Sequence, residues 1–362
     1  MLTSLEIKNF RTFSHLFIER LGRVNLILGK NNVGKTCLLE ALRLYDAGGD
    51  PRAIKAVLLA RNEVRIDPAR ECAVPMLDML FHKTSVKHDL RGQLAIGPRH
   101  ASEEHEDWLL ISGHDVSLTV VDDPISHRKQ VLSVGSLRID FGGQSRGVRC
   151  EDLLLEEREG RGSSPELPFL SPAPVSEDLV GRWWDAIVLT GLKDDVISAL
   201  KLIDQTVLDV GFVTHPLDPY RRMAMVRTSR IPEPFPLRSL GDGAVRVFNL
   251  AVALQYRGFR SEPGGAGRIL LVDEVENGIH HSAHYDVWKA LFRLAGLNDV
   301  QVFATTHSWD CLKGFARAVA EDEENDGVAI RLEKVQGQEQ TGAIIIEGND
   351  LPFVVRDSIE VR

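Results

Sequence analysis

Residues 29–36, GKNNVGKT, have the types and the spacing of a loop that binds the phosphates of a nucleotide. Gly29 and Gly34 allow the backbone to turn so that successive N–H groups face an anion. Lys35 is placed to reach the β- and γ-phosphates, and the hydroxyl of Thr36 is a suitable ligand for Mg²⁺. The spacing therefore predicts a site for a nucleoside triphosphate with its magnesium ion.

The sequence on either side of this loop favours the same interpretation. An apolar run at 24–28 predicts a buried strand, and the leucine-rich stretch 37–45 predicts a helix whose positive N-terminal end faces the phosphates. A glycine loop that occurs by chance would not be expected to lie between a buried strand and a helix. The residues that we expect to bind ATP here are Gly29, Asn31, Asn32, Gly34, Lys35, Thr36 and Cys37.

Two carboxylates follow a second apolar run. Residues 269–272 predict a buried strand that ends at Asp273 and Glu274. Asp273 is expected to hold Mg²⁺, and Glu274 is expected to polarise the attacking water as general base. His307 ends a third apolar run and is expected to sense the γ-phosphate, although a histidine at a strand end is more often structural. Together with Lys35, Glu274 and His307 are the predicted catalytic residues.

The order of these segments resembles the heads of ABC-type ATPases of the SMC, RecF and OLD group. The chain opens with LTSLEIKNFRTF, and RSLGDG, DEVENGIHHS and VQVFATTHSWDC are most similar to OLD-like AAA-domain ATP-binding proteins. The resemblance implies that Ser239, Gly241 and Gly243 form a signature that reads the γ-phosphate of ATP on a second subunit, in a head-to-tail homodimer. SLGDGAVR departs from the usual LSGGQ, so a plain turn before a helix is the alternative.

Further positions follow from this resemblance. Residues 276–280 correspond to the loop at which the two subunits of the family's dimer touch, with His280 at the interface. His280 and His284 also have the spacing of a helical zinc pair, but no third ligand is evident, so we expect no metal other than Mg²⁺. Arg11 of the NFR element is a candidate nucleotide contact or, alternatively, a solvated side chain. The family's glutamine loop is expected within 63–83.

The remaining patterns indicate how the chain is organised. Alternating apolar residues predict an antiparallel sheet layer from about Leu90 to Phe141, and 176–210 predicts a helical insertion. Within that insertion, one helix is predicted to carry Val196, Leu200, Ile203 and Val207 on one face. After Arg246, helices alternate with apolar strands.

We therefore expect an α/β fold, namely an ABC-type P-loop NTPase head with an antiparallel β lobe and a helical insertion. The predicted division is an N-terminal part of the head at 1–89, a β-rich and helical insertion lobe at 90–220, and a C-terminal part of the head at 221–362.

Composition limits the function classes. The 362 residues are 43% hydrophobic and 26% charged, with a net charge of −9, so any nucleic acid must bind to a local patch. The densest basic stretch contains Arg221, Arg222, Arg227 and Arg230, and such a run is more often the solvated face of a strand. Four cysteines without CxxC spacing indicate a reducing compartment, and we expect a cytoplasmic protein. No apolar run approaches the roughly 18 residues of a membrane span.

Three known arrangements fit less well. A transporter ATPase lacks the NFR opening, an SMC-like clamp needs a long coiled coil, and an OLD-type nuclease carries Toprim acids after the ATPase, whereas the residues after His307 are typical of the last helix and strands of a head. We therefore expect a separately encoded effector, such as a nuclease or Toprim-like protein, in phage defence or DNA maintenance. The alternative is a stand-alone RecF-like DNA-binding repair ATPase.

Overall fold

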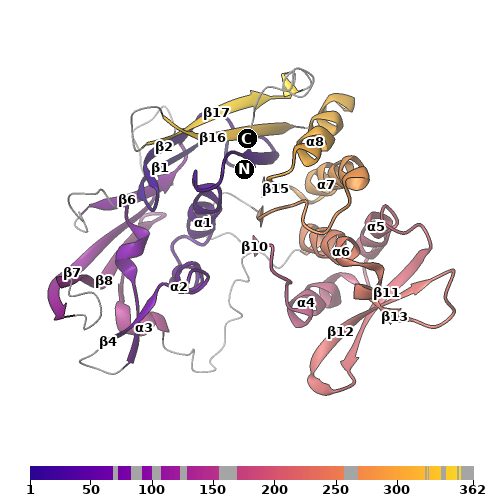
Figure 1. Cartoon of the computed structure of the whole chain (residues 1–362), viewed down its shortest axis with the longest axis horizontal. Helices are drawn as coiled ribbons and strands as arrows, with labels where there is room; N and C mark the ends of the chain where they lie inside the picture. The colour runs from indigo at the N-terminus through magenta and orange to yellow at the C-terminus, as the bar shows by residue number, and fades with distance from the viewer. Residues whose placement is uncertain are drawn as a thin grey trace.

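The computed structural model describes residues 1–67, 72–82, 92–99, 107–122, 129–154, 169–256, 268–322, 324, 326–335, 340–348 and 350–351. Two lobes meet at a central sheet (Figure 1). Among the described residues, no helix is long and apolar enough to cross a membrane.

The central sheet is mixed, and its strands come from distant parts of the chain. Their spatial order is β10 (Phe169–Leu170), β14 (Arg268–Val272), β15 (Val300–Thr305), β3 (Val24–Leu28), β16 (Gly327–Lys334) and β17 (Thr341–Glu347). All neighbours are parallel except β16 and β17. Every residue of β3 and β15 is buried, because both faces of the sheet are covered. The predicted strands at 24–28, 269–272 and 300–304 are thereby confirmed.

A second sheet, helix α1 and helix α2 cover one face of the central sheet. The second sheet is antiparallel, in the order β2 (Phe13–Ile18), β1 (Leu5–Phe10), β6 (Gln93–Gly97), β7 (Leu109–Asp122), β8 (Lys129–Phe141) and β9 (Gln144–Arg149). Helices α1 (Lys35–Asp46) and α2 (Pro51–Leu59) pack between the sheets, and Leu38, Leu42 and Ile27 belong to the core that they share. The predicted antiparallel layer is confirmed.

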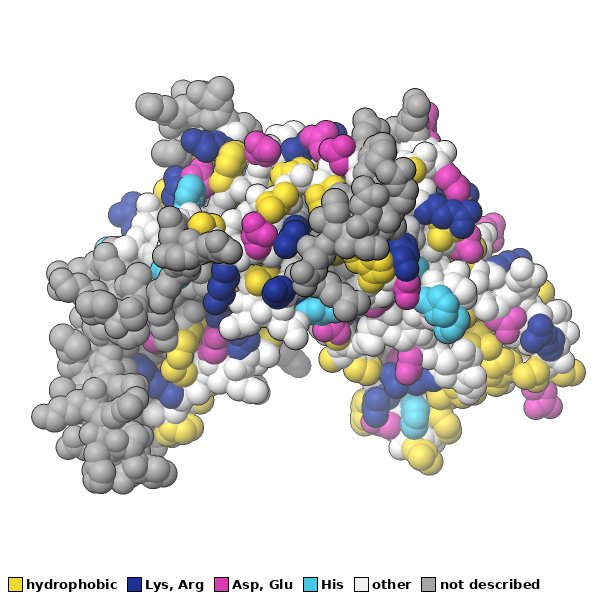
Figure 2. All heavy atoms as spheres, turned by 45° about the horizontal axis from the view of Figure 1, so that its top comes forward, with side chains coloured by type: hydrophobic (Ala, Val, Ile, Leu, Met, Phe, Trp, Pro, Cys, Tyr) yellow, Lys and Arg dark blue, Asp and Glu magenta, His cyan; other side chains and the backbone are white. Residues whose placement is uncertain are grey.

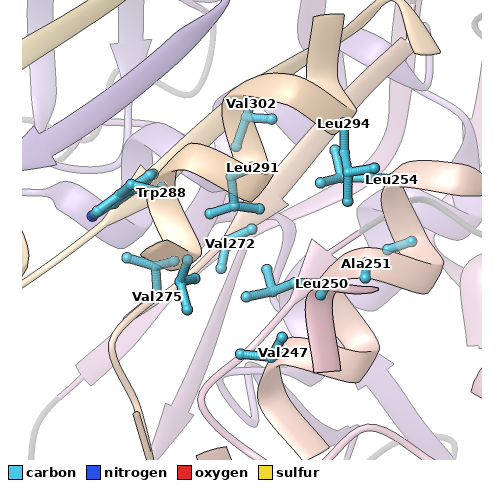
Figure 3. Close-up of a cluster of buried hydrophobic side chains, with 14 of the residues drawn as sticks. Val247, Leu250, Ala251, Leu254, Val272, Val275, Trp288, Leu291, Leu294 and Val302 are labelled. Atoms are coloured by element: carbon cyan, nitrogen blue, oxygen red, sulfur yellow. The ribbon is translucent and has the colours of Figure 1, made fainter. Parts of the chain in front are cut away.

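The other face of the central sheet is covered by helices. They are α4 (Glu177–Ile187), α5 (Leu192–Leu200), α6 (Asp242–Gln255), α7 (His284–Asn298) and α8 (Trp309–Glu321). Figure 3 shows Val247 and Leu250 of α6 facing Val272 of β14 and Val275, which all belong to one buried core. A three-stranded sheet of β11 (Val207–His215), β12 (Asp218–Thr228) and β13 (Phe235–Pro236) packs on this helical lobe.

Short elements complete the described chain. They are strands β4 (Val64–Asp67) and β5 (Cys72–Pro75), helix α3 (Cys150–Leu154), and the 3₁₀ helices η1 (Leu77–Leu80), η2 (Leu237–Leu240) and η3 (His281–Ala283).

The predicted helix through Val196, Leu200, Ile203 and Val207 is wrong beyond Leu200. Helix α5 ends at Leu200, and Val207 is the first residue of strand β11. The cause is a local turn, because the carboxylate of Asp204 accepts hydrogen bonds from the backbone N–H and the hydroxyl of Thr206, at 2.8 and 2.6 Å.

The residues of the predicted insertion, 90–220, are divided between the two lobes. Strands β6 to β9 contribute to the core on the α1 side of the central sheet, whereas α4, α5 and β11 contribute to the core on the α6 side. Trp183 and Trp184 of α4 are buried in that second core. Both parts of the segment are therefore integral to the lobes that they join.

Candidate nucleotide site

The glycine loop leaves strand β3 and leads directly into helix α1. Gly29 and Gly34 have φ angles of +140° and +107°, which disfavour any other residue. A Cβ atom at Gly29 would lie 2.5 Å from the carbonyl oxygen of Leu332, and one at Gly34 would lie 2.7 Å from the ring of Phe13. The loop is thus shaped by close packing, and it leads into α1, whose first N–H groups have no partner within the helix and are suited to an anion.

Lys35 is turned back over its own loop. Its Nζ donates hydrogen bonds to the carbonyl oxygens of Gly29 and Lys30, at 2.6 and 3.1 Å. Burial lowers the pKa of Lys35, while the nearby Asp273 and Glu274 act in the opposite direction. The ammonium is therefore held by weak neutral acceptors, which phosphate oxygens would replace.

Asp273 lies across from the loop at the end of β14. The hydroxyl of Thr36 donates a 3.4 Å hydrogen bond to Oδ2 of Asp273, and the hydroxyl of Thr305 donates to Oδ1. A carboxylate and a hydroxyl are oxygen donors of the kind that Mg²⁺ takes, and their separation suits two neighbouring positions around one ion. Thr36 and Asp273 thus fit the predicted magnesium site.

Glu274 occupies an unusual backbone conformation. Its φ angle is +50°, in the left-handed region that glutamate rarely adopts. Its N–H donates to the hydroxyl oxygen of Thr305 at 2.8 Å, and the N–H of Val275 donates to the carbonyl oxygen of Thr305 at 3.0 Å. A chain of hydrogen bonds thus runs from the Glu274 backbone through Thr305 to the Asp273 carboxylate.

His307 follows β15 at the same edge of the central sheet. Because β3, β14 and β15 are parallel neighbours, the segments after them meet at one edge, as in other open α/β sheets. The N–H of His307 donates to the carboxylate of Glu276 at 2.8 Å. A cavity of about 300 Å³ lies between the loop and this segment, lined by Leu28, Gly29, Lys30, Asn31, Thr306, His307, Ser308, Trp309 and Leu312.

The predicted signature lies on the other lobe. Ser239 and Gly241 are exposed, and Gly241, with a φ angle of +98°, precedes helix α6. Helix α6 begins at Asp242, earlier than the predicted start after Arg246. A Cβ atom at Gly243 would lie 2.6 Å from the carbonyl oxygen of Gly278, so the start of α6 packs directly on segment 276–280 of the same chain.

The Arg11 side chain is buried and bound within the chain, so the solvated alternative is wrong. Its side chain is 5% exposed, its Nε lies 2.7 Å from the carboxylate of Glu40, and its Nη1 lies 2.8 Å from that of Glu63. Arg61 binds the other oxygen of Glu40 at 2.7 Å and donates to Sγ of Cys37 at 3.3 Å. Arg11 therefore ties the β1–β2 turn to helix α1 through a buried ionic network.

Cys37 belongs to the same network, which leaves its backbone N–H as the group available to a nucleotide. Burial, followed by the nearby Glu40, raises the pKa of the Cys37 thiol. The Cys37 side chain thus faces the core, and only its backbone is placed to contact a nucleotide.

The two histidines with zinc-pair spacing do not converge. Nε2 of His284 lies 3.2 Å from the carbonyl oxygen of Ile279 in a buried position, whereas His280 is exposed and binds Ser282 through Nδ1 at 2.9 Å. No cluster of three metal-binding side chains occurs among the residues that the structure describes.

Sequence reasoning missed the roles of Thr305 and Arg246. Arg246 donates hydrogen bonds to the carbonyl oxygens of Asp273 and Glu274. Thr305 stands two residues before His307, and Arg246 lies in SLGDGAVR, but neither pattern by itself reveals these contacts. Both contacts join elements far apart in the sequence. Glu276 was placed in the interface loop, and its carboxylate in addition caps the segment that carries His307.

Comparisons with known proteins agree with this geometry. Residues 1–56 match the family described as AAA ATPase domain, and residues 205–310 match the family described as AAA domain, putative AbiEii toxin, Type IV TA system. The chain is 21% identical to an ATP/GTP phosphatase from Helicobacter pylori, over 89% of each chain. It is also 41% identical to the DNA replication and repair protein RecF from Clostridioides difficile, over 15% of each chain.

The fold matches solved SMC heads. The head bound to the C-winged helix domain of ScpA aligns with a TM-score of 0.50 and 12% identity, over 96% of this chain and 97% of that chain. The Smc head derived from Pyrococcus furiosus aligns with a TM-score of 0.50 and 9% identity, over 99% of each. The chain is an ATPase with the fold of an ABC-type P-loop NTPase head. The fold class and the hydrolytic activity predicted for this ATPase are thereby confirmed, whereas the narrower OLD-like assignment stays a prediction.

Proposed function

We propose that this ATPase closes on ATP as a head-to-tail homodimer and thereby licenses a separate effector protein, in DNA maintenance or phage defence. The observation that carries the proposal is the exposure of Ser239 and Gly241 on the helical lobe. Exposed N–H groups at the start of a helix bind anions, and a second copy would bring ATP to them. The RecF similarity supports DNA maintenance, and the free thiols of Cys37 and Cys311 suit the proposed cytoplasm.

Each catalytic residue has a defined task in this proposal. Lys35 exchanges its two loop carbonyls for phosphate oxygens. Thr36 and Asp273 hold the Mg²⁺ ion, which neutralises phosphate charge when bound. Glu274 accepts a proton from the attacking water, and His307 follows the γ-phosphate from the end of β15.

Dimer formation is tested with Glu274→Gln, which should bind ATP without turning it over. Light scattering should show a doubled mass with ATP and Mg²⁺, and Lys35→Ala, which should not bind ATP, is the control. Ser239→Arg should bind ATP normally, stay monomeric and hydrolyse slowly. An unchanged mass of Glu274→Gln at saturating ATP contradicts the proposed dimer.

The hairpin β11–β12 is the proposed docking surface for the effector. Its outer face and tip expose hydrophobic side chains, namely Leu208 at 48%, Val213 at 45%, Leu217 at 90% and Tyr220 at 93%. Figure 2 shows hydrophobic side chains gathered along the lower edge of the helical lobe, with basic side chains beside them. Exposed apolar patches with a polar rim commonly mark protein interfaces.

The charges around this hairpin indicate the chemistry of the partner. Arg222 pairs with Asp185 at 2.5 Å, and Arg227 lies 3.9 Å from Asp209, so the basic stretch is partly neutralised within the chain. Arg221 and Arg230 are exposed at the two ends of the stretch. An apolar protein segment flanked by acidic residues complements this surface better than a continuous phosphate backbone does.

Docking is tested by co-purification with the product of the adjacent gene. The test variant is Leu217→Ser with Tyr220→Ser at the tip, which leaves the buried Trp183 and Trp184 in place. This variant should lose capture while hydrolysing ATP normally. Leu297→Ser, at a site of 62% exposure on α7, is the matched control. Equal capture by both variants rules out the hairpin, and no capture by the parent favours the stand-alone repair ATPase.

A further inference from the structure

Arg246 is a buried cation with an uncommon set of partners. It lies on α6 and is 7% exposed, and its hydrogen bonds to described residues all go to backbone carbonyl oxygens. These belong to Ser171 at 2.8 Å, Asp273 at 2.6 Å and Glu274 at 3.0 Å. Burial lowers the pKa of Arg246, although Glu276 and Asp273 act against this shift. Burying a guanidinium is unfavourable, so a plain packing role would be better served by an apolar side chain.

The Arg246 guanidinium holds the backbone of Glu274 on the carbonyl side, and a second contact holds it on the N–H side. The N–H of Glu274 is bound by Thr305 from β15, and the carbonyl oxygen of Glu274 is bound by Arg246 from α6. Between these two contacts, Glu274 has its φ angle of +50°. A residue stays in such a conformation only where its surroundings hold it there. The direction of the Glu274 side chain thus depends on both contacts.

The same helix begins at the signature. Arg246 lies four residues after Asp242, the first residue of α6, which directly follows Gly241. At the first turn, Gly243 packs against the backbone of Gly278 so closely that neither position has space for a Cβ atom. The start of α6 therefore contacts segment 273–278 at both of its ends. Figure 3 shows Val247 and Leu250 on the side of α6 toward Val275, and all three belong to one buried core.

We infer that Arg246 is a positioning residue that couples the signature loop to the general base of the same chain. A nucleotide seated on Gly241 orders the start of α6, and Arg246 carries that state to the carbonyl groups of Asp273 and Glu274. The base is then aimed at its own ATP when the opposite ATP is in place. The coupling rests on the proposed dimer, whereas the hold on the Glu274 backbone does not.

The positioning role is tested by Arg246→Met and Arg246→Lys. Arg246→Met fills the space but donates no hydrogen bond, and it should lower kcat about tenfold or more while ATP affinity changes less than about threefold. Arg246→Lys keeps the charge with fewer donors, and it should recover part of kcat. Added guanidinium ion should raise kcat of Arg246→Ala and leave the parent unaffected. Arg238→Met is the control, because Arg238 is 56% exposed on the same segment.

Folding and positioning are separated by two further measurements. Thermal unfolding and ATP affinity show whether each variant is folded, and Arg246→Lys serves if Arg246→Met does not fold. Variants that lose ATP binding in parallel with turnover, with no recovery in guanidinium, would show that Arg246 serves the fold alone and would overturn the inference.

The coupling is tested by the dependence of turnover on protein concentration. The ATPase rate per parent chain should rise with protein concentration as the dimer forms. The rate per chain of Arg246→Lys should change little with concentration. The double variant Arg246→Lys with Glu274→Gln should nevertheless dimerise on ATP. If the ATPase rate per parent chain does not depend on protein concentration, the dimer is contradicted and the coupling with it. The kcat of Arg246→Met then still tests the positioning role. If parent and Arg246→Lys rise equally, the dimer stands and the coupling is wrong.

Discussion

At the scale of single residues, Thr305 connects the metal-binding acid with the general base. The residue is fully buried, its hydroxyl donates to Asp273, and it accepts from the N–H of Glu274. One oxygen atom thus fixes the relative position of the two acids. Removing this one hydroxyl is therefore a small substitution that should disturb the site.

Thr305→Val should remove this link at nearly constant volume. It leaves the N–H of Glu274 without its partner, which costs about 1–3 kcal/mol of unfolding free energy, and turnover should fall about tenfold. Thr228→Val is the control, because Thr228 is also buried and accepts a 3.3 Å hydrogen bond from the N–H of Ile231, away from the site. Denaturant unfolding and ATPase assays check both variants, and equal loss of turnover in the two would refute the link.

Lys35 predicts a pH dependence of ATP binding. Burial lowers its pKa from the ordinary 10.5, and bound phosphates favour the ammonium form, so binding takes up a proton at pH values above the lowered pKa. ATP affinity should therefore weaken as pH rises, beginning below 10.5. Isothermal titration calorimetry across alkaline pH measures this effect, together with proton uptake. Lys35→Arg stays charged throughout and should show a flatter profile; equal profiles would exclude Lys35 as the titrating group.

The sequence was sufficient to predict where several candidate site residues lie, but not which residues hold them in place. Lys35, Thr36, Asp273 and His307 follow apolar strands, so their common sheet edge could be predicted from local pattern alone. Arg11 could not be placed in this way, because its partners Glu40 and Glu63 depend on how the two sheets pack. The roles of Thr305 and Arg246 likewise depend on tertiary contacts.

At the scale of elements, the buried ionic network fixes α1 to the β1–β2 turn. Arg11, Glu40 and Glu63 have side chains that are 5%, 7% and 15% exposed. Burial raises the pKa of Glu40, while Arg11 and Arg61 lower it, so the carboxylate depends on its cationic partners. Because α1 also carries Lys35, the network fixes the position of the helix that follows the phosphate loop.

Arg11→Ala should therefore destabilise the fold by about 3–5 kcal/mol, because two carboxylates lose a buried partner. Arg20→Ala is the control: Arg20 pairs with Glu347 at 2.5 Å, but both side chains are about half exposed, and such pairs contribute about 0–1 kcal/mol. Urea unfolding compares the two variants with the parent. If Arg11→Ala lowers the free energy of unfolding no more than Arg20→Ala does, the buried ionic network does not stabilise the fold as proposed.

Element boundaries show why periodicity alone was misleading. Val196, Leu200, Ile203 and Val207 keep a helical spacing, yet the side chain of Asp204 bonds to Thr206 and ends the run. Val207 is then buried as the first residue of a strand. A single local hydrogen-bonding residue thus outweighed four apolar ones, whereas the mostly apolar runs of β3 and β15 formed the predicted strands.

At the scale of the whole molecule, β3 has neighbours only from the far end of the chain. It pairs with β15 on one side and with β16 on the other. The side-chain amide of Gln301 also donates to the carbonyl oxygen of Leu2 at 2.8 Å. The N-terminal part of the described chain is thereby joined to strands from its C-terminal part.

A fragment of residues 1–154 should therefore not fold by itself, since β3 would expose two unpaired edges. Circular dichroism should show no cooperative thermal transition, whereas co-expression with residues 155–362 should restore a complex that unfolds cooperatively and binds ATP. A fragment that folds alone would show that the antiparallel sheet and α1 form an independent domain.

The interleaved position of β3 has a consequence for protein synthesis. The phosphate loop leaves the ribosome before the two strands that flank β3, because β15 and β16 are translated about 270 to 300 residues later, by their numbering. A nascent or prematurely terminated chain thus carries a P-loop that has no sheet to hold it and no acid opposite it. Unfinished copies would consume no ATP and would expose β3, which marks them for chaperones and proteases.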